Sequence, residues 1–186
     1  RTIQILEKFP DIRNKWLYRI RHILIDEFQD TNDVQFKLVR LLMDDTTKLY
    51  VVGDPDQTIY TWRGANQDII LKYELTFPGA ETIILNENYR STQNILNCAN
   101  KLIAYNKKRV PKDLFTSNVG GDKVQYQSCF SREIEASNIA SKIEILKRTD
   151  YNFRYSDVLI LYRAAYLTQP VEKAFMAKRL PYKIYG

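Results

Sequence analysis

The sequence predicts an α/β fold in which parallel strands alternate with crossover helices. Three short apolar runs, at residues 23–25, 49–52 and 82–85, are separated from one another by helix-length segments. Each run ends in polar residues, and the carboxyl ends of parallel strands meet at one edge of a sheet. We therefore expect parallel sheets flanked by helices, with a ligand site at that edge.

The first half of the chain also contains helix signals. Residues 1–20 place apolar side chains at roughly helical spacing and are interrupted at Pro10, so they predict two short helices. After the first strand, Thr31 or Asn32 can cap a helix over about residues 33–43. The glycines and prolines of the next segment predict a loop with short helical turns.

A second α/β block is expected after residue 86. Ser91 can cap a helix that ends near the basic residues 107–109. The further elements that we expect are a short strand at 124–129, a helix at 132–148, a buried strand at 158–162, a helix at 169–179 and a strand at 182–185. This pattern predicts two domains, residues 1–86 and 87–186.

The composition limits the classes of protein. With 186 residues, 45% of them hydrophobic and 27% charged, the chain can bury a core. The formal net charge of +6 is compatible with an anionic partner such as nucleic acid. The two cysteines, Cys98 and Cys129, are far apart and no signal peptide precedes them, so we expect reduced thiols in a cytoplasmic protein. No apolar stretch is long enough to span a membrane.

The first polar cluster follows the strand at residues 23–25. Asp26 and Glu27 are adjacent carboxylates at the end of this apolar run, which we expect to be buried. Asp26 can hold Mg²⁺ and Glu27 can hold the same ion or polarise an attacking water. A strand followed by an ordinary acidic turn is the alternative.

The second cluster lies in the loop of residues 53–65. Gln57 has both a donor and an acceptor, which suits it to orient a water or contact a terminal phosphate. Tyr60, Trp62 and Arg63 combine two aromatic rings with a guanidinium, a set that can stack on unpaired bases and grip their backbone. In the alternative interpretation, the rings pack in the core and Arg63 is a surface charge.

The third cluster lies at the expected domain boundary. Tyr89 offers a ring on which a purine can stack, and Arg90 is always charged and can reach a phosphate. Alternatively, Tyr89 packs between domains and Arg90 is an ordinary surface residue.

Together the three clusters resemble motifs II, III and IV of superfamily 1A DNA helicases of the UvrD/PcrA/Rep type. Residues 26–32 read DEFQDTN, residues 53–65 read GDPDQTIYTWRGA, and residues 88–92 read NYRST. The order and spacing fit along the whole chain, and the combination is far more specific than any one motif. The resemblance implies a RecA-like P-loop NTPase core, with part of domain 1A in residues 1–86 and part of domain 2A in residues 87–186.

The resemblance also implies roles for these residues. Asp26 would be the Mg²⁺-associated Walker B acid and Glu27 the base that activates water for ATP hydrolysis. Gln57 would sense the γ-phosphate, which Arg90 would also contact, while Tyr89 would stack on the adenine. The DNA-facing residues would be Tyr60, Trp62 and Arg63.

The phosphate-binding loop of the family is missing from the sequence. None of the six glycines is followed by Lys and then by Ser or Thr, as a Gly-x-x-x-x-Gly-Lys-[Ser/Thr] loop requires. The chain also begins at Arg1 and stops after a strand-like run. We therefore expect an internal fragment of a larger enzyme, unable to hydrolyse ATP or unwind DNA by itself.

The function that the resemblance implies for the parent protein is ATP-driven movement along single-stranded DNA in the 3′ to 5′ direction. Duplex unwinding at single-strand/double-strand junctions, in repair or replication, would follow from this movement. Two alternatives stay open: a subunit of a RecB/AddA-like helicase-nuclease, and a non-catalytic nucleic-acid-binding module on the same core. The motifs identify no protein partner.

Overall fold

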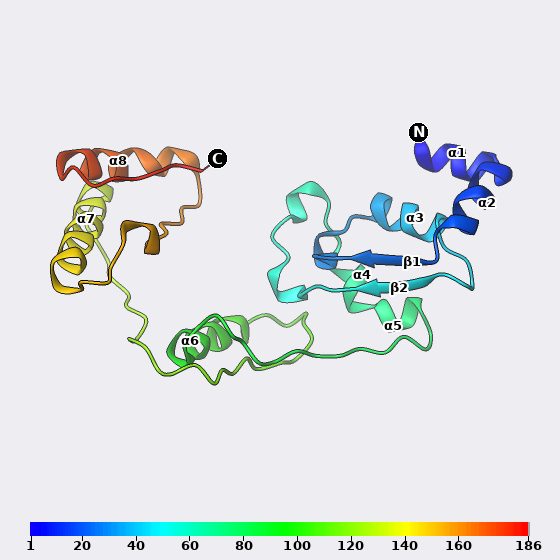
Figure 1. Ribbon diagram of the computed structural model, residues 1–186, viewed down its shortest axis with the longest axis horizontal. Helices are drawn as coiled ribbons and strands as arrows, with labels where there is room; N and C mark the ends of the chain where they lie inside the picture. The colour runs from blue at the N-terminus through cyan, green and yellow to red at the C-terminus, as the bar shows by residue number, and fades with distance from the viewer. Residues whose placement is uncertain (186) are drawn as a thin grey trace. The chain divides into compact units, whose positions relative to one another are not determined.

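The computed structural model describes residues 1–185 and divides into two compact units (Figure 1). The first unit is Arg1–Val124 and the second is Gln125–Gly186. The expected boundary between residues 86 and 87 concerns the domains of a parent protein and stays a prediction.

The first unit contains a two-stranded sheet and six α-helices among its described residues. Its elements are α1 (Thr2–Lys8), α2 (Pro10–Arg19), β1 (His22–Ile25), α3 (Asp33–Leu41), β2 (Lys48–Val51), α4 (Gln67–Leu71), α5 (Tyr73–Thr76) and α6 (Gln93–Ile103). Single 3-10 turns lie at Phe28–Asp30, Pro55–Gln57 and Thr61–Arg63. The two expected N-terminal helices, the first two strands and the turns of the loop are confirmed.

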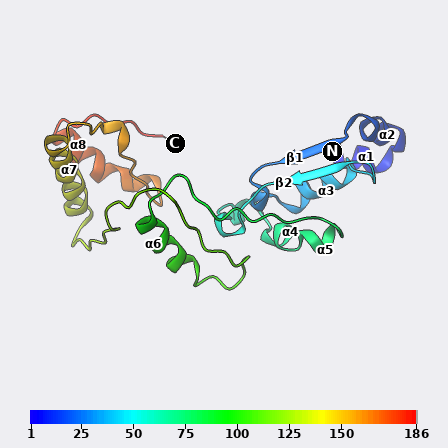
Figure 2. The ribbon, with the colours of Figure 1, turned by 60° about the horizontal axis from the view of Figure 1, so that its bottom comes forward.

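Strands β1 and β2 are parallel, and α3 forms the crossover between them. Ile23 pairs with Leu49 and Ile25 with Val51, so both strands end at the same edge. This arrangement confirms an α/β fold. Helices α3, α4 and α5 lie on one side of the sheet (Figure 2). Because the helices cover one side only, Leu24 remains 73% exposed, and the expectation that this strand is buried is wrong.

Helix α3 begins with a capping box. The Asn32 side chain accepts a hydrogen bond from the Gln35 backbone N–H, and the Gln35 side chain accepts one from the Asn32 backbone. This reciprocal pairing satisfies two backbone groups at the helix start, so Asn32 rather than Thr31 is the cap. The cap of α6 is Thr92, one residue after the expected Ser91.

The core of the first unit is centred on Phe28, the residue that follows Glu27. Phe28 has no exposed surface, and its ring meets the rings of Phe36 and Tyr73 edge to face at centroid distances of 6.2 and 5.8 Å. Such aromatic pairs add to the hydrophobic contribution of the buried ring. The acidic strand end is therefore fixed by the next residue in the chain.

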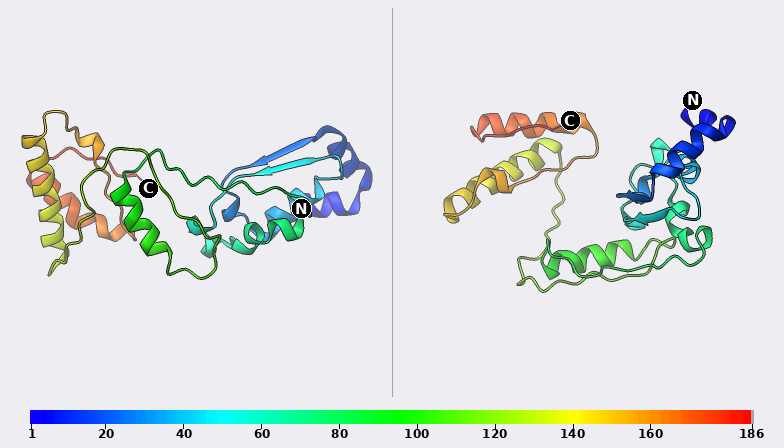
Figure 3. Two further views of the ribbon diagram at one scale, coloured as in Figure 1. Left: turned by 90° about the horizontal axis from the view of Figure 1, so that it is seen from below. Right: turned by 45° about the vertical axis from the view of Figure 1, so that its right-hand side comes forward.

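The second unit is built on two helices, α7 (Arg132–Thr149) and α8 (Thr168–Ala177), which pack against each other (Figure 3). Both helices were expected, at residues 132–148 and 169–179. Single 3-10 turns lie at Tyr155–Asp157 and Ala165–Leu167. The core of this unit consists of Ala140, Ile143, Phe153, Phe175 and Leu180.

Four expected strands are absent from the described residues, namely 82–85, 124–129, 158–162 and 182–185. A strand is stable only when a neighbour pairs with its backbone N–H and C=O groups. Leu85, Leu159 and Leu161 are between 74% and 84% exposed, while Val158 and Ile160 pack on the core. All four runs therefore lack a strand partner among the described residues, and residues 158–162 rest one side on a helical core. The expectation of a buried strand at 158–162 is wrong.

Two further expectations concern the chain as a whole. Among residues 1–185, no helix is both long and apolar enough to cross a membrane. Cys98 and Cys129 are free thiols.

Candidate functional site

The end of β1 places Asp26 and Glu27 at the carboxyl edge of the sheet. Glu27 has φ 50° and ψ 42°, a left-handed conformation that is rare for a residue with a side chain. Such a conformation costs about 1–3 kcal/mol, and residues held in it cluster at active sites, ligand clamps and switch regions. The Asp26 carboxylate accepts a hydrogen bond from the Glu27 backbone N–H (2.9 Å), and both side chains are exposed. The turn thus presents both carboxylates to solvent.

Gln29 connects this turn to the loop after β2. Its side chain is 1% exposed; Nε2 donates to Glu27 Oε2 (2.7 Å), and Oε1 accepts from the Asp54 backbone N–H (3.0 Å). The Phe28 N–H also donates to the Val52 carbonyl (2.9 Å), so the two strand ends remain joined beyond the sheet. Gln29 lies within the DEFQDTN stretch, but the sequence does not indicate its linking role, because its partner Asp54 lies 25 positions away.

Gly53 allows this close approach. A Cβ atom at this position would lie 2.6 Å from Gln29 Oε1 and 3.0 Å from both the Phe28 backbone nitrogen and Ile70 Cδ1. The 2.6 Å contact is shorter than Cβ atoms adopt, and the two 3.0 Å contacts are tight, so a side chain here would force the neighbours to shift. The absence of a side chain at Gly53 is therefore what lets the second loop pack on the first.

Asp54 holds Gln57 in place. Gln57 Nε2 donates to Asp54 Oδ2 (2.9 Å), while Asp54 Oδ1 accepts from the Asp56 backbone N–H (3.0 Å) and from Lys112 Nζ. Burial alone would raise the pKa of Asp54, but the hydrogen bonds from Lys112 and Gln57 outweigh burial, and the pKa lies below its usual value of 3.8. The structure thus links Glu27 to Gln57 through Gln29 and Asp54.

A second acidic residue of the same loop is paired with arginine. Arg109 Nε lies 3.2 and 3.1 Å from the two carboxylate oxygens of Asp56, and Nη2 donates to Oδ2 at 2.8 Å. Lys112 Nζ lies 3.4 Å from Asp56 Oδ2. The sequence indicated only a basic cluster at 107–109, and the pairing with Asp56 became visible only in the structure.

Tyr60, Trp62 and Arg63 are brought together on the far part of the loop. The Arg63 guanidinium lies over the Tyr60 ring at 5.0 Å and over the Trp62 ring at 4.5 Å. Trp62 is 73% exposed, so the alternative in which these rings are core aromatics does not hold for it. Exposed rings joined by a guanidinium can stack on unpaired bases.

Tyr89 and Arg90 lie in a turn formed by their neighbours. The Asn88 side chain accepts hydrogen bonds from the Arg90 and Ser91 backbone N–H groups (3.0 and 2.7 Å). The Tyr89 hydroxyl donates to Glu87 Oε2 (2.8 Å), and this hydrogen bond raises the pKa of Tyr89. The Tyr89 ring is 77% exposed rather than packed between domains.

The structure does not join this turn to the other predicted site residues. Among residues 1–185, no hydrogen bond or ion pair connects Tyr89 or Arg90 with Asp26, Glu27 or Gln57. The acidic strand end and the Gln57 loop form one contiguous arrangement, and the Tyr89 turn stands apart from it.

The acidic turn offers carboxylate oxygens to a metal ion. Within the described part of the chain, no group of three or more His, Cys, Asp or Glu side chains could enclose a metal ion. Mg²⁺, however, is commonly held by one or two carboxylates, with water and phosphate oxygens completing the shell. The exposed Asp26 and Glu27 carboxylates fit this pattern.

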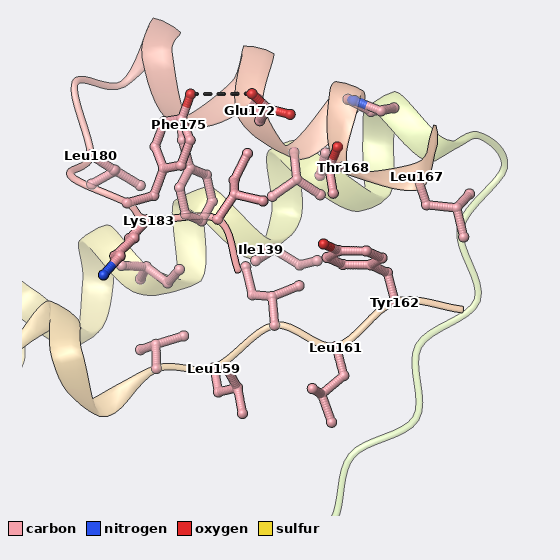
Figure 4. Close-up of a pocket in the computed structure, with 18 of the residues that line it drawn as sticks. Ile139, Leu159, Leu161, Tyr162, Leu167, Thr168, Glu172, Phe175, Leu180 and Lys183 are labelled. Carbon is pink, nitrogen blue, oxygen red and sulfur yellow. Dashed lines mark hydrogen bonds between the residues drawn. The ribbon is translucent and has the colours of Figure 1, made fainter. Parts of the chain in front are cut away.

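A concave feature of the second unit contains none of the predicted site residues. A groove of about 1110 Å³ lies between α7, α8 and the segment 158–162 (Figure 4). Its lining is mainly apolar and includes Ile139, Leu159, Leu161, Phe175 and Leu180.

Family models match nearly the whole chain. Residues 1–78 match the UvrD/REP helicase N-terminal domain, and residues 83–186 match the UvrD-like helicase C-terminal domain. The chain therefore belongs to the UvrD/Rep helicase family, and the resemblance inferred from the three motifs is confirmed.

Three curated relatives illustrate how similar the chain is to named helicases. A probable DNA helicase II homolog of Mycoplasma capricolum is 47% identical over 183 residues, which is 98% of this chain and 25% of the relative. The ATP-dependent DNA helicases PcrA of Staphylococcus epidermidis and Leuconostoc citreum are 43% and 41% identical over 185 residues, again covering 25% of each relative. The chain thus spans about a quarter of the length of these relatives.

Proposed function

We propose that this chain is part of an ATP-dependent DNA helicase and contributes the hydrolytic acids and one DNA-contacting loop. The observation that carries the proposal is the loop of residues 53–65. At one end, Asp54 is tied through Gln29 to Glu27, and at the other, Trp62 and Arg63 form an exposed cluster. One short segment can therefore sense both nucleotide and DNA. The names of the curated relatives support this proposal.

The proposed reaction is attack of water on the γ-phosphorus of ATP, which breaks the bond to the oxygen of the leaving ADP. Glu27 accepts the proton from this water, and a positioned general base typically contributes about 10²–10⁴-fold. Gln57 orients the water or contacts the γ-phosphate. Bound Mg²⁺ would neutralise phosphate charge, with Asp26 and Glu27 as its protein ligands.

Tyr89 and Arg90 complete the proposed nucleotide site. Tyr89 stacks on the adenine, and Arg90 contacts the γ-phosphate; an arginine on the transferring phosphoryl group is worth about 10³–10⁵-fold in general. Arg90 is exposed and, in the described part of the chain, forms no ion pair, so its guanidinium is available for a phosphate. Because Arg90 and Glu27 are proposed to act at the same γ-phosphate, the two residues must move closer together when nucleotide binds.

The finer features of the proposal rest on the family resemblance. They are a RecA-like core, partial domains 1A and 2A in residues 1–86 and 87–186, and cytoplasmic location. The same source supports 3′ to 5′ movement on single-stranded DNA and unwinding at single-strand/double-strand junctions, in repair or replication.

The catalytic assignment can be tested in the longer protein that we propose contains this chain. Glu27→Gln should abolish DNA-stimulated ATP hydrolysis while leaving the affinity for single-stranded DNA unchanged. Glu81→Gln is the matched control, because Glu81 is an exposed glutamate outside the site. Normal hydrolysis by the Glu27→Gln variant would contradict the assignment.

The DNA-contacting loop needs a separate test. Trp62→Ala should weaken binding of an oligothymidylate by about 10-fold, since stacking contributes about 1–3 kcal/mol per base. Tyr151→Ala removes an aromatic ring that is 99% exposed elsewhere and should leave the affinity unchanged.

The proposed 3′ to 5′ direction of movement is tested with duplexes that carry either a 3′ or a 5′ single-stranded tail. The longer protein should unwind the duplex with the 3′ tail, and preference for the 5′ tail would contradict the proposed direction.

The chain of 186 residues alone is expected to be inactive. It contains no Gly-x-x-x-x-Gly-Lys-[Ser/Thr] loop to hold the phosphates of ATP. DNA-dependent hydrolysis of ATP by the purified chain would overturn this expectation.

A further inference from the structure

Asp54 and Asp56 form an ion-pair cluster with Arg109 and Lys112. The acids lie within the stretch that matches the N-terminal family model, and the bases within the stretch that matches the C-terminal one. All four belong to the first compact unit. The cluster therefore joins the Gln57 loop to the segment after α6, across 53 to 58 positions of sequence.

The burial of the cluster distinguishes it from ordinary surface pairs. The Asp56 side chain is 8% exposed, and those of Arg109 and Lys112 are each 12% exposed. Surface ion pairs contribute little, whereas removal of one partner of a buried pair leaves an uncompensated charge. Arg109 also donates to the Lys112 carbonyl (3.1 Å), which fixes the backbone of the basic segment. The segment is therefore held in one definite position on the loop.

Asp54 is the point where this cluster meets the proposed site. One carboxylate oxygen accepts from Lys112 and the other from Gln57 Nε2 (2.9 Å). Rotation of the Asp54 carboxylate would therefore change both contacts together. Lys112 itself forms no hydrogen bond with Gln57 or Glu27 in the described residues, so any influence on Gln57 passes through Asp54.

We propose that Lys112 is a positioning residue, which holds the Asp54 carboxylate in the orientation that presents Gln57 to the terminal phosphate. The inference rests on the proposed function, since it concerns the ATP hydrolysis assigned above. Displacement of the segment that carries Arg109 and Lys112 would release Gln57. The cluster would thus make hydrolysis depend on the position of a segment that contacts neither water nor phosphate.

The test is a double-mutant cycle in the longer protein. Lys112→Met removes the charge at similar length and should lower kcat for DNA-stimulated ATP hydrolysis about 10-fold, within the range of coupling between contacting residues, with little change in KM. In a Gln57→Ala background, the same substitution should have no further effect. Lys107→Met is the matched control on the same segment, because Lys107 is exposed and should leave kcat unchanged.

Lys112→Arg guards against a purely structural loss. Arginine keeps the charge beside Asp54, so this variant should retain most of the wild-type kcat. The inference would be overturned if Lys112→Met lowered kcat equally in the wild-type and the Gln57→Ala backgrounds, or if it changed KM alone. In either case, DNA-stimulated hydrolysis by the wild type would still support the proposed function. Absence of DNA-stimulated hydrolysis in the wild type would instead overturn the proposed function, and this inference with it.

Discussion

The Gln29 side chain donates to the Glu27 carboxylate at 2.7 Å from a position that is almost completely buried. The Gln29 side-chain oxygen Oε1 accepts a hydrogen bond from the backbone N–H of Asp54. A buried amide whose donor and acceptor are both used has a single preferred orientation. Gln29 therefore fixes the position of Glu27 relative to the Gln57 loop.

Replacement of Gln29 should separate these two parts of the site. Gln29→Leu has similar volume but leaves the Asp54 N–H unpaired, a cost of about 1–3 kcal/mol for a buried donor. We expect a lower free energy of unfolding and a lower kcat of the longer protein. Urea unfolding and DNA-stimulated ATP hydrolysis are the two measurements, and Gln125→Leu, at an exposed position, is the control. Unchanged kcat would contradict a positioning role for Gln29.

A methyl group at Gly53 should have a similar effect from the other side. Gly53→Ala places a Cβ atom 2.6 Å from Gln29 Oε1, so the loop must move. Overpacking of this kind costs about 1–3 kcal/mol of unfolding free energy. Gly120→Ala, where a Cβ atom meets nothing within 4 Å, should leave the unfolding midpoint unchanged. Equal midpoints for the two variants would show that the close approach is not tight in solution.

The Phe28 ring should be the main anchor of the acidic turn. Phe28→Ala removes a fully buried ring and should lower the free energy of unfolding by about 3–5 kcal/mol. Phe130→Ala is the matched control, since that ring is fully exposed and should change stability little. Denaturant unfolding of both variants checks this expectation. A decrease in the free energy of unfolding of less than about 1 kcal/mol for Phe28→Ala would contradict it.

The Lys112–Asp54 pair should be visible in the pH dependence of stability. The pKa of Asp54 is lowered in the folded protein, so the carboxylate contributes stability that is fully present above its ordinary pKa of 3.8. This contribution is lost as the pH falls below 3.8 and the folded carboxylate takes up a proton. Urea unfolding at several pH values between 6 and 3 measures this loss. The free energy of unfolding should therefore fall less steeply with decreasing pH for Lys112→Met than for the wild type. Parallel curves would contradict the contribution of Lys112.

The residues that sequence reasoning could locate are those whose chemistry is local. Asp26 and Glu27 are adjacent, and Tyr60, Trp62 and Arg63 lie within four positions, so their grouping was visible in the sequence and the structure brings each set together. Gln29 and Lys112 both contact Asp54, which is 25 and 58 positions away from them. No local pattern records contacts over such distances.

The same distinction explains the errors in the fold. A helix satisfies its own backbone, so the apolar spacing of residues 132–148 sufficed to predict α7. A strand needs a neighbour, and residues 158–162 have the composition of a strand without a partner among the described residues. Composition therefore predicts which segments can pair, but pairing itself depends on the rest of the molecule.

The small sheet of the first unit has a practical consequence for work with this chain in solution. Neither outer edge of β1 or β2 is paired within the described residues, and beside these edges Leu24 and Tyr50 expose apolar surface. Open edges and an apolar face are a template on which a second molecule can add its own strands. The isolated chain should therefore self-associate, and its apparent unfolding midpoint should rise with protein concentration.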